Sequence, residues 1–134
     1  MRIQITFIAL ITGVIMLPGQ PVHADGHGGY DLYELRTYHA NEGKIDALHA
    51  RFRNHTMALF EKHGMKNIAY WHPAEQPDTL IYIIAHKNAD AAAASWAAFG
   101  ADPAWQEAYA NSIADGRLIK ELESVYMSKT DYSP

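Results

Sequence analysis

The residues best suited to chemistry lie in one short stretch, Tyr30–Lys44, with the sequence YDLYELRTYHANEGK. Side chains of a β-strand alternate between its two faces, so a strand here places Glu34, Arg36 and Tyr38 on the same face. An arginine side chain presents a planar fork of donors that can bind a carboxylate or phosphate at two points. The pattern therefore allows two roles for Glu34 and Arg36, a ligand-binding site or a structural ion pair that fixes the register of a sheet.

Two further stretches, 66–72 (KNIAYWH) and 79–86 (TLIYIIAH), are rich in aromatic and β-branched residues and are predicted to be strands. Their tyrosines and histidines could line a cavity for a flat apolar ligand, although such side chains also build cores and interfaces. The residues that we expect to line a ligand pocket are Glu34, Arg36, Tyr38, Tyr70, His72, Tyr82 and His86.

Metal chemistry has two candidate sites in the sequence. His39, His72 and His86 lie near predicted strand ends and could bind a transition metal or haem iron, but no HxH or HxxxH spacing joins them, so we interpret them as solvated side chains. If the chain is cleaved after Ala24, the new terminal amine of Asp25, two amides and His27 could form a square-planar Cu(II) site. Otherwise no cofactor is expected.

The first 24 residues have the pattern of a secretory signal peptide: a positive start at Arg2, an apolar run, and small residues before position 25. The apolar run is shorter than the ~20 residues of a membrane span, so we expect cleavage rather than an anchor, and a periplasmic or secreted product with no membrane contact. Residues 25–29 (DGHGG) would be a flexible lead, followed by one domain at 30–134.

Composition excludes several classes of function. The chain has no cysteine, which excludes disulfides, thiolate metal sites and thiol nucleophiles. Its net charge of −4 becomes −5 when Arg2 is removed with the signal, and no basic stripe is present, so we expect no nucleic-acid binding. Neither a nucleophile–base pair nor a phosphate-binding loop is recognisable, which leaves Glu34, His72 and His86 as the candidates for proton transfer.

The elements that position these residues follow from hydrophobic spacing and from helix signals. A strand at 30–39 precedes a helix capped by Asn41 and ended by Gly64, with Arg51 facing water. After the two strands at 66–72 and 79–86, a second helical region begins at Asn88 or Asp90, breaks at Gly100, restarts at 102–103 and is followed by a last strand at 118–127.

The order strand, helix, strand, strand, helix, strand predicts an α+β, ferredoxin-like βαββαβ domain, a four-stranded antiparallel sheet with both helices on one face. We expect the face that carries Glu34, Arg36, Tyr82 and His86 to be the uncovered one. Because so much aromatic and apolar surface is rarely left to solvent, a second copy of the sheet would cover it and form a homodimer.

Six short motifs in register identify a resemblance to the NIPSNAP family. They are Tyr33–Tyr38 (YELRTY), Gly43-Lys44, Leu59–Met65 (LFEKHGM), Tyr70-Trp71, Asp102–Trp105 (DPAW) and Glu123–Val125 (ESV). The resemblance covers nearly all of 30–134 and implies a dimeric α/β-barrel in which two ferredoxin-like sheets pack face to face. The family commonly has proline before Gly-Lys, where this chain has Glu42.

The family is similar in fold to small monooxygenases and haem-degrading enzymes but has no agreed reaction, and its eukaryotic members resemble mitochondrial adaptors, a role that the export signal excludes here. We therefore expect an exported homodimer that binds a small organic ligand or a protein. A small oxygenase or haem-handling enzyme is the alternative, and it rests on analogy of fold.

Overall fold

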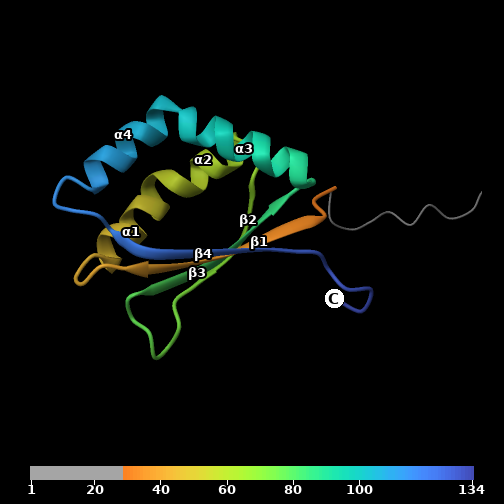
Figure 1. Cartoon of the computed structure of the whole chain (residues 1–134), viewed down its shortest axis with the longest axis horizontal. Coiled ribbons are helices and arrows are strands. Elements are labelled where there is room, and N and C mark those ends of the chain that lie inside the picture. Colours follow the sequence, from red (N-terminus) through yellow and green to blue (C-terminus); the bar gives the residue numbers. More distant parts are fainter. Residues whose placement is uncertain (1–28) are drawn as a thin grey trace, which may run out of the picture.

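The computed structural model describes residues 29–134, which form one four-stranded antiparallel sheet with all of the helices on one side (Figure 1). The strands are β1 (Leu32–Ala40), β2 (Lys66–Trp71), β3 (Thr79–His86) and β4 (Ile119–Met127). The helical segments are α1 (Ile45–Arg51), η1 (Phe52–Thr56), α2 (Met57–Lys62), α3 (Ala89–Ala101) and α4 (Pro103–Ser112). The strand order β2-β3-β1-β4 confirms the ferredoxin-like prediction.

The expected signal peptide at 1–24 and the Asp25–His27 copper site lie outside the described residues, as does nearly all of the lead at 25–29. Between residues 29 and 134, no helix has the length and apolar character needed to span a membrane.

The prediction of which sheet face is covered was wrong. Glu34, Tyr38, Tyr82 and His86 are buried beneath the helices, and Arg36 is largely buried with them. The uncovered face carries the alternate set, which includes Leu35, Ile81, Ile83 and Val125; Leu35 pairs with both Ile83 and Val125. The division of the strand side chains into two faces was predicted correctly. The expectation that the charged face is exposed was wrong, because the buried charges of Glu34 and Arg36 are paired.

The first helix differs from the single regular helix that we predicted. A π-helical segment, η1, joins α1 to α2, with the amide of Met57 bonded to the carbonyl of Phe52. Asn41 does not cap α1, because its side chain donates to the carbonyl of Arg117 instead, at 2.8 Å. Gly64 ends the helix with φ of +80°, as expected for a left-handed terminal residue.

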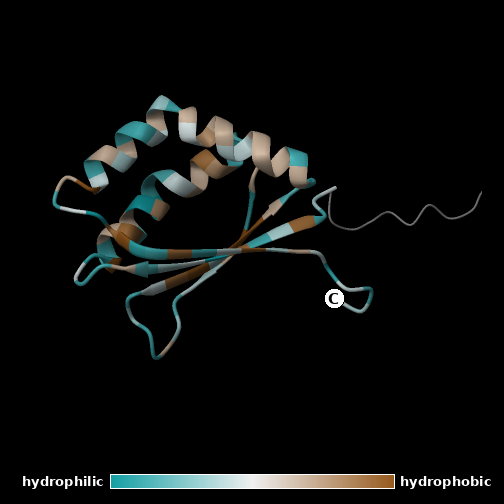
Figure 2. Cartoon of the chain, in the orientation of Figure 1, coloured by the Kyte–Doolittle hydropathy of each residue, from teal (hydrophilic) through white to brown (hydrophobic). Residues whose placement is uncertain are grey.

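The second helical region runs further than predicted. Helix α3 passes through Gly100 and ends at Ala101, so the break lies at Asp102, two residues later than expected. Asn88 caps α3 by accepting the amide of Ala91, and Asp102 caps α4 by accepting the amide of Ala104, with Pro103 in the first turn. Apolar residues recur along both helices and strands (Figure 2).

The core lies between the helices and the sheet and is largely aromatic. Phe52 and Phe60 from the first helical region pack against Tyr82, with ring centroids 5.1 and 6.1 Å away, and Phe60 also contacts Phe99 of α3 at 5.1 Å. This packing fixes the distance between helices and sheet, and therefore the space in which the site forms.

Candidate ligand-binding site

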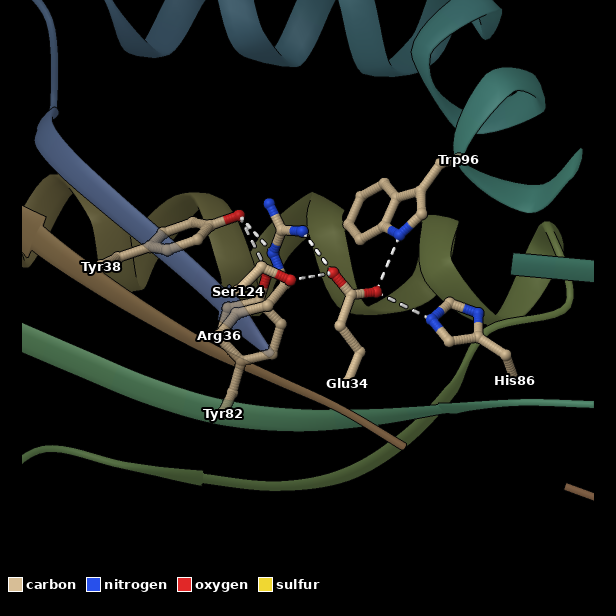
Figure 3. Close-up of polar contacts among 7 residues, drawn as sticks. All are labelled: Glu34, Arg36, Tyr38, Tyr82, His86, Trp96 and Ser124. Carbon is tan, nitrogen blue, oxygen red and sulfur yellow. Dashed lines mark hydrogen bonds and ion pairs between the residues drawn. The ribbon is translucent and has the colours of Figure 1, made fainter. Parts of the chain in front are cut away.

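The carboxylate of Glu34 accepts four hydrogen bonds beneath α3 (Figure 3). Its Oε1 accepts from Arg36 Nη1 at 2.5 Å and from Ser124 Oγ at 2.7 Å. Its Oε2 accepts from Trp96 Nε1 and from His86 Nε2, each at 2.8 Å. Two carboxylate oxygens offer about four acceptor positions, so the group is saturated by donors from β1, β3, β4 and α3.

These hydrogen bonds decide the charge of Glu34, whose side chain is only 1% exposed. Burial raises the pKa of a carboxyl group, but the donors His86, Ser124, Arg36 and Trp96 outweigh burial and lower the pKa of Glu34 to about 2. Glu34 is therefore a fixed anion at neutral pH. An anion without a free acceptor position is unsuited to act as a general base.

His86 has one bonded and one unbonded ring nitrogen. Because Glu34 is ionised, Nε2 of His86 must be the donor to Oε2, which assigns the proton to this nitrogen. Its Nδ1 is buried and has no hydrogen-bond partner among residues 29–134. His86 is thus held in the hydrogen-bond network of Glu34 and is not free for proton exchange with a ligand.

Arg36 joins this network to a pair of tyrosines. Its Nε donates to Tyr38 Oη at 3.2 Å, and its guanidinium lies 4.4 Å from the ring centre of Trp96. Burial lowers the pKa of Arg36, but Tyr38 and Tyr82 together with the hydrogen bonds to Glu34 and Tyr38 raise it above its ordinary value. Arg36 is therefore permanently charged, and its charge is balanced by Glu34.

A cavity of about 470 Å³ lies beside this network, between the helices and strands β1 and β4. Arg36 and Tyr38 form part of its wall, whereas Glu34 and His86 do not contribute to its lining. Most of the remaining wall is aromatic or aliphatic, and the residues concerned include Phe52, Phe60, Trp96, Phe99, Trp105, Tyr109, Ile113 and Leu122. Its size and composition are those of a site for a small organic molecule.

Arg51 also lines the cavity, and the sequence analysis missed it by assigning it to the solvent-exposed side of the helix. The residue is 5% exposed, and its guanidinium lies 5.2 Å from the ring centre of Trp105 and 5.4 Å from that of Tyr109. A usable signal existed, because Arg51 follows Leu48 by three residues and therefore shares its helix face.

The predicted pocket residues separate into two groups. Hydrogen bonds join Glu34, Arg36, Tyr38, Tyr82 and His86, but only Arg36 and Tyr38 of these line the cavity. Tyr70 stacks on Tyr82 with ring centroids 5.1 Å apart, but its hydroxyl donates to Asn67, and burial raises its pKa. His72 is exposed and lines a second, more open cavity of about 680 Å³ beside α1 and β2.

The three strand-end histidines do not converge. His39 pairs with Thr79, at the opposite end of β3 from His86, so the two lie about 23 Å apart along the sheet. Within residues 29–134, no group of three or more His, Cys, Asp or Glu side chains is arranged to hold a metal ion. The hypothesis that His39, His72 and His86 together hold one metal ion therefore has no common site.

Comparison with known proteins gives one family. The NIPSNAP family model matches residues 33–134. A NIPSNAP family protein of unknown function from Agrobacterium tumefaciens is 26% identical over 81% of this chain and 96% of its own, with a TM-score of 0.68. An uncharacterised NIPSNAP domain protein from Burkholderia xenovorans is 19% identical over 77% and 98%, with a TM-score of 0.66.

More distant likeness extends to another group of proteins with the same fold. A proposed antibiotic biosynthesis monooxygenase from Nitrosomonas europaea is 15% identical over 73% of this chain and 97% of its own, with a TM-score of 0.54. No curated protein matches the sequence significantly. At this identity the likeness concerns the fold alone.

The saturated carboxylate predicts a pH-dependent effect of Glu34→Gln. At neutral pH the substitution leaves Arg36 buried without its counter-charge and should lower the free energy of unfolding by about 3 kcal/mol. The pKa of Glu34 falls from 4.5 to about 2 on folding, so its stabilisation is complete above pH 4.5 and is lost as the pH falls through 2. Urea unfolding across this range should show the difference between the two proteins shrinking.

The matched control is Glu107→Gln on α4, since Glu107 is exposed and lies away from the uncovered sheet face. It should change the free energy of unfolding by less than about 0.5 kcal/mol at every pH. A difference between Glu34→Gln and the unmodified protein that stays constant from pH 4.5 to 2 would contradict the assigned charge of Glu34.

Proposed function

We propose that this chain, which belongs to the NIPSNAP family, is a homodimeric protein that binds a small organic ligand between sheet and helices. No reaction is given for the NIPSNAP relatives described above, so the proposal rests on the chain's own cavity. The observation that carries the proposal is the cavity of about 470 Å³ walled by aromatic side chains and by two largely buried arginines, Arg36 and Arg51. Pockets of this size bury most of the surface of a small molecule.

The same residues favour binding over catalysis. Glu34 is ionised and saturated, His86 is bonded to it, and His72 lies at the other cavity, so none of the three candidates for proton transfer faces the ligand space. The cavity wall offers no nucleophile beside a base among the described residues. The likeness to a monooxygenase adds no reactive group to this wall, so an oxygenase remains the weaker reading.

The homodimer is supported by the uncovered sheet face. Leu35, Ile81 and Ile83 lie there partly exposed, and Val125 is 52% exposed. Apolar surface of this extent is normally covered in a stable protein, and a second copy of the same face is the self-complementary cover. The underside of the sheet carries no helix in Figure 1.

Export to the periplasm or the medium is part of the proposal and is supported by the sequence pattern of residues 1–24. In an oxidising compartment the absence of cysteine leaves the protein insensitive to thiol oxidation, which suits a binding protein held by its core alone.

Ligand binding can be tested with three naphthalene probes that share one ring system: naphthoate, naphthylmethanol and naphthylmethylammonium. At millimolar concentration at least one probe should raise the thermal midpoint by a few degrees. Leu122→Trp, which places an indole in the cavity wall, should abolish that rise, whereas Tyr132→Trp in the exposed C-terminal tail should not. No rise with any probe, or an equal rise in both variants, would refute the proposed pocket.

The dimer can be tested with Val125→Asp on the uncovered face. A charge buried between two sheets is strongly unfavourable, so the variant should be monomeric by light scattering at concentrations where the unmodified protein is dimeric. Ala93→Asp on the exposed side of α3 is the matched control and should stay dimeric. A monomeric unmodified protein, or a Val125→Asp variant that still dimerises, would refute this interface.

A further inference from the structure

Arg51 is a buried cation that lacks a counter-charge within residues 29–134. Its Nη1 donates to Ser112 Oγ at 3.1 Å, and its Nε is buried with no acceptor. No carboxylate of the described chain pairs with it. An unpaired charge in an apolar wall is costly, and burial accordingly lowers the pKa of Arg51. The fold thus maintains an unsatisfied donor that points to a missing partner.

The local backbone directs this side chain to the cavity. Arg51 is the last residue of α1, and η1 begins at the next position. The hydroxyl of Thr56 donates to the carbonyl of Arg51 at 3.3 Å across this π-helical segment. Arg51, Phe52 and Thr56 all line the cavity, so the wider π turn brings successive residues to its wall. Such π segments are frequent at functional sites.

The two largely buried arginines of the cavity, Arg36 and Arg51, differ in their hydrogen-bond partners. Arg36 is bonded to Glu34 and Tyr38, and it stacks near Trp96. Among residues 29–134, Arg51 makes one side-chain hydrogen bond, to the neutral Ser112, and two ring contacts, and no carboxylate pairs with it. The wall therefore has one net buried positive charge from these two residues, and that charge belongs to Arg51.

Tyr38 supplies a second donor beside that charge. Its oxygen accepts from the hydroxyl of Tyr82 at 2.9 Å and from Arg36 Nε at 3.2 Å. With both acceptor positions occupied, the proton of Tyr38 remains available to donate. Tyr38 and Arg51 both line the cavity. Two donors without an acceptor between them form a receptor for an anion.

The remaining residues of the cavity wall indicate the shape and polarity of the rest of the ligand. Trp96, Phe99 and Trp105 supply flat apolar surfaces, with the rings of Phe99 and Trp105 4.4 Å apart. At the rim, Arg117 and Lys120 are exposed and outnumber the one carboxylate of the lining, Glu121, so the entrance attracts negative charge. A single buried cation balances one negative charge, and a dianion would leave one unbalanced.

We propose that the cavity binds a monocarboxylate with a flat apolar body, whose carboxylate is held by Arg51 and Tyr38. This inference rests on the proposed function and narrows its ligand class. It also assigns Arg51 a role in binding that opposes stability, since the empty protein carries the cost of the buried charge.

Isothermal titration with the three naphthalene probes tests the charge preference on the unmodified protein. Naphthoate should bind at least about tenfold more tightly than naphthylmethanol, and naphthylmethylammonium should not bind measurably. If naphthylmethanol binds as tightly as naphthoate, the carboxylate inference is wrong while the ligand pocket stands. If none of the three binds, both the inference and the proposed function fail.

Arg51→Met separates a binding role from a structural one. It should weaken naphthoate binding at least about tenfold and leave naphthylmethanol within about threefold. Its thermal midpoint should equal or exceed that of the unmodified protein, because methionine fills the site without a buried charge. Arg53→Met, at an exposed position two residues on, should change neither. Unchanged naphthoate affinity in Arg51→Met, or a lowered thermal midpoint, would overturn the proposal. If the variant does not fold, the titration of the unmodified protein with the three probes tests the proposal instead.

Discussion

The structure depends on the saturation of one buried carboxylate. Glu34 lies on the central strand β1 and accepts from Arg36 on the same strand, Ser124 on β4, His86 on β3 and Trp96 on α3. Four donors lower its pKa to about 2, so its negative charge persists under all ordinary conditions. The same bonds hold three strands in register and fasten α3 to the sheet. A partly satisfied group at this position would cost more than it contributed, so these partners act as a unit.

Arg36 and Arg51 have different roles because the buried carboxylate of Glu34 neutralises only Arg36. Glu34 neutralises Arg36 and fixes it against Trp96 and Tyr38, which makes this side of the cavity rigid and electrically balanced. The balance leaves Arg51 as a buried cation that no carboxylate pairs with in the described part of the chain, with its Nε unbonded. A ligand anion would gain binding free energy by pairing with this buried charge, which destabilises the protein when no ligand is bound. A site that lowers stability in this way is common in functional proteins. The Glu34–Arg36 pair thus supports the cavity wall, to which Arg51 also contributes.

Much of the fold could be predicted from the sequence, because alternation and helix signals are local. The strand at 79–86 and the cap Asp102 were predicted correctly, and Asn88 was one of the two caps predicted for α3. The covered face was not, since period-two alternation separates two faces without stating which one the helices cover. The charges of Glu34 and Arg36 led to the wrong face, because the pairing that allows them to be buried is visible only in the three-dimensional structure. Arg51 was missed because an arginine on a helix is normally exposed, although its spacing of three residues from Leu48 placed it on the buried helix face.

The central claim is that Arg51 keeps a donor free for an anion while Arg36 does not. The most direct measurement is nuclear magnetic resonance of the arginine side-chain Nε–H groups in isotope-labelled protein during a titration with naphthoate. The account predicts that the Arg51 Nε–H signal moves in a saturable way as it gains an acceptor, while the Arg36 Nε–H signal, already bonded to Tyr38, moves far less. An Arg51 signal that stays unchanged at saturating naphthoate, or that moves no more than the Arg36 signal, would contradict it.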